Sequence, residues 1–205
     1  MIRLAAAILL CAAILAPAAA RAQGVAPDVL VRTVTDDVIA VIKKDKDIQA
    51  GDQSKTIELV DEKVLPHFDF QRMTALAMGL NWRKASSEQR KELVGEFRTL
   101  LVRTYSTALT GYRDQVIEVL PLRTPATGDD VTVRSEVRQS GTEPVSIDYS
   151  MHRTPEGWKI YDVAVGGVSL VTTYRDTFNQ EVRAHGVDGL IKSLAEKNRQ
   201  LRAKR

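Results

Sequence analysis

Cysteine is nearly absent from this chain, and long apolar runs are confined to its start. The 205 residues contain one cysteine, Cys11, which lies inside the apolar run from Leu4 to Leu15. That run is too short for a membrane-spanning helix, which needs roughly 20 residues. Arg3 before the run and Ala20-Arg21-Ala22 after it instead predict a secretory signal that is cleaved.

Cleavage after Ala22 would leave residues 23–205 as one domain. Leu10 stands where lipidation of Cys11 would require a small residue, so we expect Cys11 to be discarded with residues 1–22. The mature protein then has no cysteine. It can function in an oxidising compartment without disulfides, and its own hydrophobic core must hold it together.

A large excess of charge of one sign is also missing. The chain has 29 Lys and Arg against 26 Asp and Glu, and loss of Arg3 and Arg21 leaves 27 against 26. A nucleic-acid binder would normally carry a basic face within its fold, so this class is excluded. The sequence predicts a solvated basic helix end, with contact to anionic lipid head groups as the alternative. Its cations are Lys192, Lys197, Arg199, Arg202, Lys204 and Arg205.

Residue patterns for metal or phosphate binding are weak or missing. His67, His152 and His185 are never at ligand spacing, which argues against zinc. Residues 45–56 faintly resemble a calcium loop, but Thr56 stands where a bidentate glutamate is needed. Gly166-Gly167 is not followed by the Lys-Ser/Thr of a P-loop. We expect no metal and no cofactor.

One carboxylate is a candidate for acid–base chemistry. Asp162 shares the strand parity of Trp158 and Ile160, so its side chain is expected to face inward. An inward carboxylate with a raised pKa is what such an enzyme requires. A buried ion pair is the preferred interpretation of Asp162, and catalysis is the alternative.

Helical periodicity dominates the first half of the mature chain. It predicts a helix from Pro27 to about Lys44, a second with Ile57, Val60 and Val64 inward, and a third over residues 69–78. Ser86 and Gln89 have capping-box spacing. The helix that they begin is predicted to run to Tyr112 through a broad apolar stripe.

Alternation of apolar and polar residues follows Gly111. It predicts strands over residues 115–120, 131–137, 145–151 and 158–165, joined by short turns. Four sequential strands imply an antiparallel meander, whose apolar face must be covered by the helices. We therefore expect an α+β domain with amphipathic helices on one side of a curved four-stranded antiparallel sheet. This is the general plan of NTF2-like cones.

The segment from Trp158 to Leu190 is the most informative. A strand ends at Gly166-Gly167, Ser169 is placed to cap a helix, Gly186 ends that helix, and Asp188 can cap the next. This segment resembles the C-terminal part of the MlaC family, also called toluene-tolerance auxiliary proteins. The resemblance extends to Leu76-Ala77-Met78-Gly79 and to the helix from Ser86, and covers nearly the whole mature chain.

The resemblance implies a periplasmic phospholipid carrier that is not an enzyme. Its implied partners are phospholipid, an outer-membrane lipoprotein–porin complex of the MlaA type and an inner-membrane ABC transporter with an MlaD-type ring. It also implies an apolar pocket for acyl tails. Val168 lies in the sequence segment that most closely resembles the family. By this resemblance the lining residues are Leu76, Leu80, Phe97, Leu101, Tyr105, Ile147, Tyr149, Val163, Val168 and Val171.

Two other functions remain open at this point. An NTF2-like periplasmic enzyme would act on a small apolar substrate and would depend on Asp162. A periplasmic chaperone or adaptor would bind proteins and carry no lipid. Native lipid content separates these alternatives from the carrier.

Overall fold

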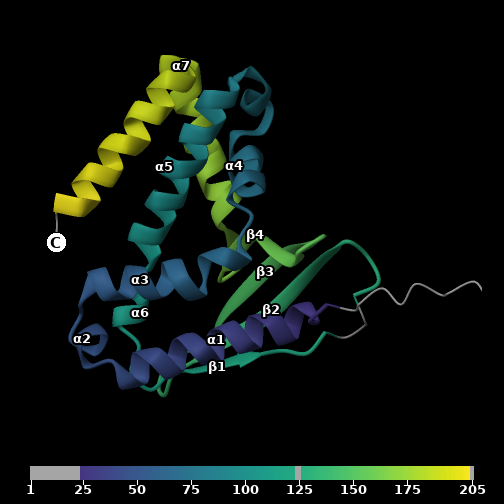
Figure 1. Ribbon diagram of the computed structural model, residues 1–205, viewed down its shortest axis with the longest axis vertical. Coiled ribbons are helices and arrows are strands. Elements are labelled where there is room, and N and C mark those ends of the chain that lie inside the picture. The colour runs from purple at the N-terminus through teal and green to yellow at the C-terminus, as the bar shows by residue number, and fades with distance from the viewer. Residues whose placement is uncertain (1–23, 123–125, 204–205) are drawn as a thin grey trace, which may run out of the picture.

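The computed structural model describes residues 24–122 and 126–203 (Figure 1). The predicted signal, residues 1–22, and the final pair Lys204 and Arg205 lie outside these residues. Within the described ranges, no helix combines the length and hydropathy needed to cross a membrane.

The elements follow the predicted order of helices, strands and helices. The helices before the sheet are α1 (Pro27–Lys44), α2 (Lys46–Gln49), α3 (Gln53–Lys63), α4 (Phe70–Met78), α5 (Ser87–Tyr105) and α6 (Thr107–Thr110), with 3₁₀ turns η1 (Leu65–His67) and η2 (Gly79–Lys84). The strands are β1 (Val116–Val119), β2 (Asp130–Arg138), β3 (Val145–Thr154), β4 (Gly157–Val165) and β5 (Val168–Ser169), and α7 (Leu170–Ala203) follows them.

The predicted helix starts are confirmed by their caps. The Ser86 hydroxyl accepts the Gln89 N–H at 3.2 Å, and Gln89 Oε1 accepts the Ser86 N–H at 2.9 Å. This is the predicted capping box, and it satisfies two amide groups at the start of α5. Asp69 caps α4 by accepting the Arg72 N–H at 2.8 Å.

The predicted extension of α5 to Tyr112 is wrong. The helix ends at Tyr105, and the short helix α6 follows Ser106. The Thr107 hydroxyl donates to the Thr104 carbonyl at 3.3 Å, and the Thr110 hydroxyl donates to the Thr107 carbonyl at 2.8 Å. Such side-chain hydrogen bonds compete with the helical ladder, and the apolar stripe gave no sign of them.

The sheet is an antiparallel meander in the order β1-β2-β3-β4-β5, so the predicted topology is confirmed. It has five strands rather than four. The fifth strand pairs Val168 with Val165 and Ser169 with Ala164. Gly166 and Gly167 form the turn between β4 and β5 at φ 57° and 82°, values that only glycine adopts without strain.

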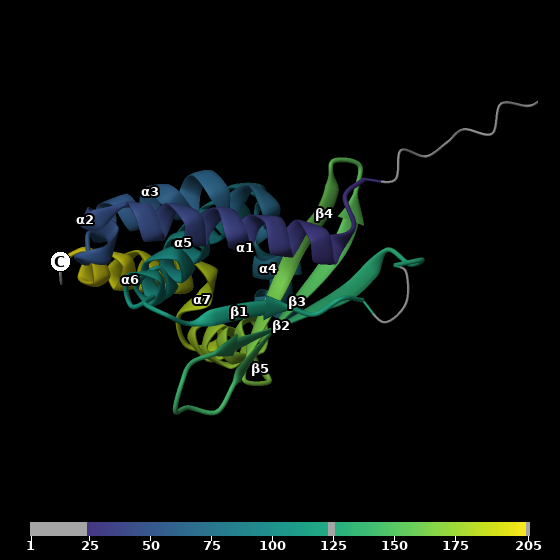
Figure 2. The same ribbon diagram turned by 90° about the horizontal axis from the view of Figure 1, so that it is seen from below.

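Cross-strand pairs show which side chains share a face, because paired residues point the same way. Val133 pairs with Tyr149, and Tyr149 pairs with Val163. Val31 and Leu30 of α1 pack against the cluster formed by this face. We call this apolar side the inner face. Figure 2 shows α1 lying along the sheet.

The other side of the sheet, the outer face, is polar at the end where β1 begins. Arg138 contacts Glu136 at 2.8 Å and Glu118 at 3.3 Å. The register pairs Val116 with Arg138 and Glu118 with Glu136, so Val116 also lies on the outer face. The alternation of β1 and β2 thus separates an apolar inner face from a charged outer face.

Buried side chains form three clusters. The first joins α4, α5 and α7 around Phe97 and Phe178, and the second joins α1 to the sheet around Val133 and Met151. The third joins α1, α2 and α3 around Ile42. Among the described residues, Phe68 is the one side chain that packs against both the first and the second cluster.

Polar contacts join the first cluster to the sheet at the same place. The Asp69 N–H donates to the Ile160 carbonyl at 2.8 Å, and His152 Nε2 lies 2.9 Å from Asp69 Oδ2. Arg72 contacts Asp130 at 2.8 Å and lies 3.9 Å above the Tyr161 ring. The start of α4 is therefore fixed to β2, β3 and β4 by specific contacts.

Gly186 breaks α7 as predicted. Its φ of 72° and ψ of −176° are not helical, and the helix resumes beyond it. The Asp188 carboxylate, predicted to cap the resumed helix, accepts a hydrogen bond from Gln89 Nε2 at 2.6 Å. Asn198 donates to the Glu96 carbonyl at 2.9 Å, so the second arm of α7 is joined to α5.

The aromatic core between α5 and α7 is expected to dominate stability. Phe178→Ala removes a side chain that is 1% exposed and packs edge-to-face on Phe97 at 5.0 Å. We expect a loss of about 3–5 kcal/mol in the free energy of unfolding. Urea denaturation measures it. Leu80→Ala, at a side chain that is 78% exposed, is the control and should change the value by less than about 0.5 kcal/mol.

Candidate functional site

The inner face of the sheet becomes steadily more exposed toward the β4–β5 turn. Val133 is completely buried beneath the helices, whereas its cross-strand neighbours Tyr149 and Val163 are half-buried. One step further, Ile147 is half-buried and pairs with Val165, which is 40% exposed. Val168 pairs with Val165 and is 61% exposed. The apolar surface is thus continuous from core to solvent.

The ten residues predicted to line the pocket lie in three different settings. Phe97, Leu101 and Val171 are buried in the cluster of α4, α5 and α7, and Leu76 packs against it. Ile147, Tyr149 and Val163 lie together on the inner face. Leu80, Tyr105 and Val168 are 78%, 41% and 61% exposed, and Leu80 lies on η2, away from the sheet.

Tyr149 brings one polar atom to this inner face. The Ser135 hydroxyl, 1% exposed, donates to the Ile147 carbonyl at 3.2 Å. Burial raises the pKa of the Tyr149 phenol, and a hydrogen bond with Ser135 partly opposes this. The phenol is therefore neutral at physiological pH and fits an apolar environment.

A column of aromatic rings lines the contact between α5 and α7. Phe97 packs edge-to-face on Phe178 and on Tyr174, with 5.0 Å between ring centroids in both cases. Burial, followed by the neighbouring Tyr105, raises the pKa of Tyr174 to about 12. The column thus runs from the fully buried Phe178 to the exposed Tyr105. Sequence reasoning did not select Tyr174, although its i, i+4 spacing to Phe178 places both on one helix face.

Asp162 has a structural role at the start of α7. Its carboxylate accepts the Ser169 hydroxyl at 2.6 Å and the Val171 N–H at 3.1 Å. Ser169 in turn accepts the Thr172 N–H at 3.0 Å, which confirms its predicted capping role. The expectation of an ion pair for Asp162 is wrong, because helix-terminal donors take the place of a cation.

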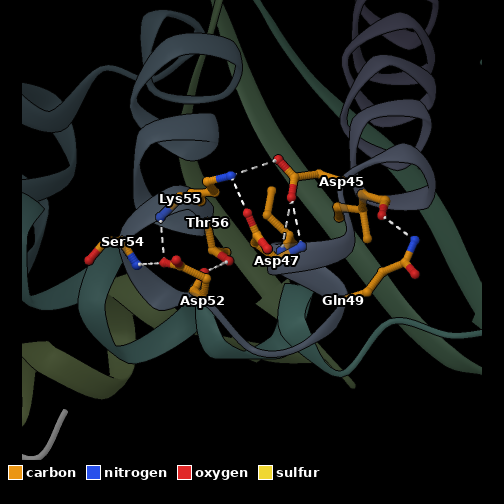
Figure 3. Close-up of polar contacts among 9 residues, drawn as sticks. Asp45, Asp47, Gln49, Asp52, Ser54, Lys55 and Thr56 are labelled. Atoms are coloured by element: carbon orange, nitrogen blue, oxygen red, sulfur yellow. Dashed lines mark hydrogen bonds and ion pairs between the residues drawn. The ribbon is translucent and has the colours of Figure 1, made fainter.

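In the acidic segment at residues 45–56, the side-chain ammonium of Lys55 lies among the carboxylates (Figure 3). Lys55 Nζ lies 2.5 Å from Asp47 and 3.8 Å from Asp45. Asp45 and Asp52 cap α2 and α3, and the hydrogen bond from the Ile48 N–H lowers the pKa of Asp45. The rejected calcium loop is thus a pair of capped helix starts around an ammonium group.

The histidines are scattered, as their spacing predicts. His152 contacts Asp69 and His185 contacts Glu181, each at 2.9 Å. Burial and the nearby Lys159 lower the pKa of His67. Within residues 24–122 and 126–203, no three His, Cys, Asp or Glu side chains are grouped to hold a metal ion.

A surface groove of about 590 Å³ lies elsewhere, between η1, α5 and the β3–β4 turn. Phe68 and Phe70 contribute stacked rings, with centroids 5.6 Å apart. Arg98 and Lys159 are already engaged with Asp61 and the Pro66 carbonyl. None of the ten predicted pocket residues lines this groove, although Phe68, which does, also packs against the second cluster.

The chain folds as an α+β domain. The apolar surface of its inner face is continuous from the buried core to the exposed β4–β5 turn. A family model described as "MlaC protein" matches residues 32–196. This match covers most of the chain, and the protein belongs to the MlaC family. The suspected resemblance is therefore confirmed.

Individual relatives agree with this assignment. The chain is 22% identical over 173 residues to the intermembrane phospholipid transport system binding protein MlaC of Haemophilus influenzae, covering 83% of this chain and 81% of that protein. It is 23% identical over 163 residues to the toluene tolerance protein ttg2D of Pseudomonas putida, covering 79% and 75%.

A solved structure is similar over nearly its full length. The phospholipid-binding protein from Ralstonia solanacearum, determined in complex with a phospholipid, is 41% identical in sequence. The two structures superpose with a TM-score of 0.80, covering 86% of this chain and 98% of that one. The α+β fold is thus shared with a protein that holds a phospholipid.

The raised pKa of Tyr174 predicts a pH effect on stability. An unfolded tyrosine ionises near pH 10, whereas folded Tyr174 remains neutral until about pH 12. The unfolded state therefore loses its proton first, and stability is lost as the pH rises above about 10. In Tyr174→Phe this loss should be smaller. Urea denaturation at neutral pH and at about pH 11 measures it, and an unchanged pH dependence would contradict the prediction. Tyr112→Phe is the control.

Proposed function

We propose that this protein is a periplasmic phospholipid carrier that moves lipids between the outer and inner membranes. The observation that carries the proposal is the phospholipid in the Ralstonia relative, with 41% identity and a TM-score of 0.80. The proposed role is maintenance of outer-membrane lipid asymmetry, without chemistry on the lipid. The named relatives are binding and transport proteins, which agrees with this role.

The physical need for a carrier comes from the acyl chains. Two chains contain roughly 30 methylenes, and at about 0.8 kcal/mol each their full exposure to water would cost on the order of 20 kcal/mol. Lipid cannot cross an aqueous compartment at a useful rate against such a cost. A carrier must cover the chains with apolar surface, and the inner face offers such surface without a competing charge.

We propose that the acyl chains lie between the inner face of the sheet and the helices. Half-buried apolar side chains face this region from the sheet and from α1, among them Tyr149 and Leu30. The first and second clusters meet only at Phe68 among the described residues. A core divided in this way can separate around a ligand more easily than a single interlocked one. The predicted lining residues Ile147, Tyr149, Val163 and Val168 belong to this wall.

The proposed partners follow from the family. They are an outer-membrane lipoprotein–porin complex of the MlaA type and an inner-membrane ABC transporter with an MlaD-type ring. The rival enzyme is less well supported, because Asp162 is occupied as a helix cap. The chaperone or adaptor predicts a protein without lipid.

Lipid content is the direct test. We expect organic extraction of the natively purified mature protein, followed by mass spectrometry, to give near-stoichiometric diacyl phospholipid. Bound lipid co-elutes with the folded protein and is lost from it after partial denaturation. Contaminating membrane does not depend on the fold in this way, so the comparison distinguishes the two. Folded protein that carries no lipid would reject the proposal and favour the enzyme or the adaptor.

A charge at Val168 should remove the lipid while retaining the fold. Val168→Glu places a carboxylate on the proposed path of an acyl chain, where contact with hydrocarbon costs several kcal/mol unless the carboxylate is neutralised. Bound phospholipid per protein should fall strongly. Val116→Glu is the matched control, because Val116 is also 61% exposed but lies on the outer face. Unchanged lipid content in Val168→Glu would count against the assignment of this residue.

A further inference from the structure

Three exposed valines cluster at one corner of the inner face. Val145 is 44% exposed, Val165 is 40% exposed and Val168 is 61% exposed. We call these three residues the valine corner. They belong to β3, β4 and β5, and a soluble domain seldom groups large exposed apolar side chains without a function.

The register places the valine corner on the apolar side of the sheet. Val165 pairs with Val168 and with Ile147, so the three share one face. Val145 lies two residues before Ile147 on β3, which gives it the same orientation. Tyr149 and Val163, one step inward, pack against the cluster beneath α1. The valine corner therefore continues the apolar side beyond the proposed lipid-binding wall, and of its three residues only Val168 belongs to both.

The backbone holds this corner in place. Gly166 and Gly167 make the turn between Val165 and Val168, and the Gly166 N–H donates to the Ser146 carbonyl at 2.9 Å. Directly after the turn, Ser169 is fixed to Asp162 at 2.6 Å. The exposed valines thus stand on a tightly bonded hairpin, and in Figure 2 β5 lies at the border of the molecule, away from α1.

We propose that the valine corner is the threshold over which phospholipid acyl chains enter and leave the protein. This proposal rests on the proposed function. An acyl chain that slides across apolar side chains remains partly covered throughout its passage, whereas a polar edge would expose it to water before it reached the wall. The occupant is the hydrocarbon chain itself, because the corner is continuous with the wall and carries no charged side chain of its own.

A threshold changes rates and leaves the bound state unaltered. Val145 and Val165 would contact the chain during passage, so polar substitutions there raise the barrier for uptake and release equally. We expect lipid transfer in V145S/V165S to be about tenfold slower in both directions, with unchanged lipid content at equilibrium. Val168 is left intact in this variant because it is also a proposed lining residue.

The experiment measures transfer of a fluorescent phospholipid between the mature protein and vesicles of phosphatidylethanolamine and phosphatidylglycerol. Stopped-flow dequenching gives the uptake and release rates, and mass spectrometry gives the lipid content of the same samples. V116S is the control, since Val116 is likewise an exposed strand valine, at 61%, but lies on the outer face. Thermal melting checks that all variants are folded.

Slower transfer in V145S/V165S, with normal lipid content and a wild-type rate in V116S, would support the threshold. A wild-type rate in V145S/V165S would overturn it. Equal slowing in V116S would overturn it as well, because the effect would not depend on the face. If wild-type protein carries no lipid, both the threshold and the proposed function fail. The other outcomes bear on the threshold alone and leave lipid binding intact.

Discussion

The carboxylate of Asp162 is the contact on which the geometry of the candidate site depends. It joins β4 to the first turn of α7 by accepting from Ser169 and from the Val171 N–H, and so fixes the direction in which α7 leaves the sheet. The turn between these elements uses two glycines in the left-handed region. Because α7 carries Tyr174 and Phe178 into the helical cluster, this junction sets the distance between that cluster and the inner face of the sheet.

The second constraint is the divided core. A carrier needs walls that are stable without ligand and still leave room for hydrocarbon, and a single close-packed core would leave none. Here α4, α5 and α7 pack around their own aromatic rings, while α1 completes a separate cluster on the sheet. Contacts at the start of α4, between Asp69 and His152 and between Arg72 and Asp130, hold these parts together at one side.

Much of this arrangement is encoded locally and could be predicted from the sequence. The capping box at Ser86, the glycine breaks at residues 166, 167 and 186, and the alternation in β2 and β3 are local signals, and each is present as expected. The end of α5 at Tyr105 was missed because hydroxyl side chains compete with the helix inside an apolar stripe. The cap formed by Asp162 and the exposure of Val165 depend on tertiary pairing. For the same reason, the alternation of apolar and polar residues predicted which face of the sheet Ile147 and Tyr149 occupy. It could not predict which residues of that face are buried and which are exposed to solvent.

The break at Gly186 also gives the molecule an electric polarity. Beyond it, α7 turns along α5, and the described end of the chain lies on the opposite side from the strands (Figures 1 and 2). This arm carries Lys192, Lys197, Arg199 and Arg202 against Asp188 and Glu196. The arm therefore has more cations than carboxylates and lies away from the strands. In the field of an anionic membrane, the resulting dipole would exert a torque on the diffusing protein and bias its orientation before any contact is made.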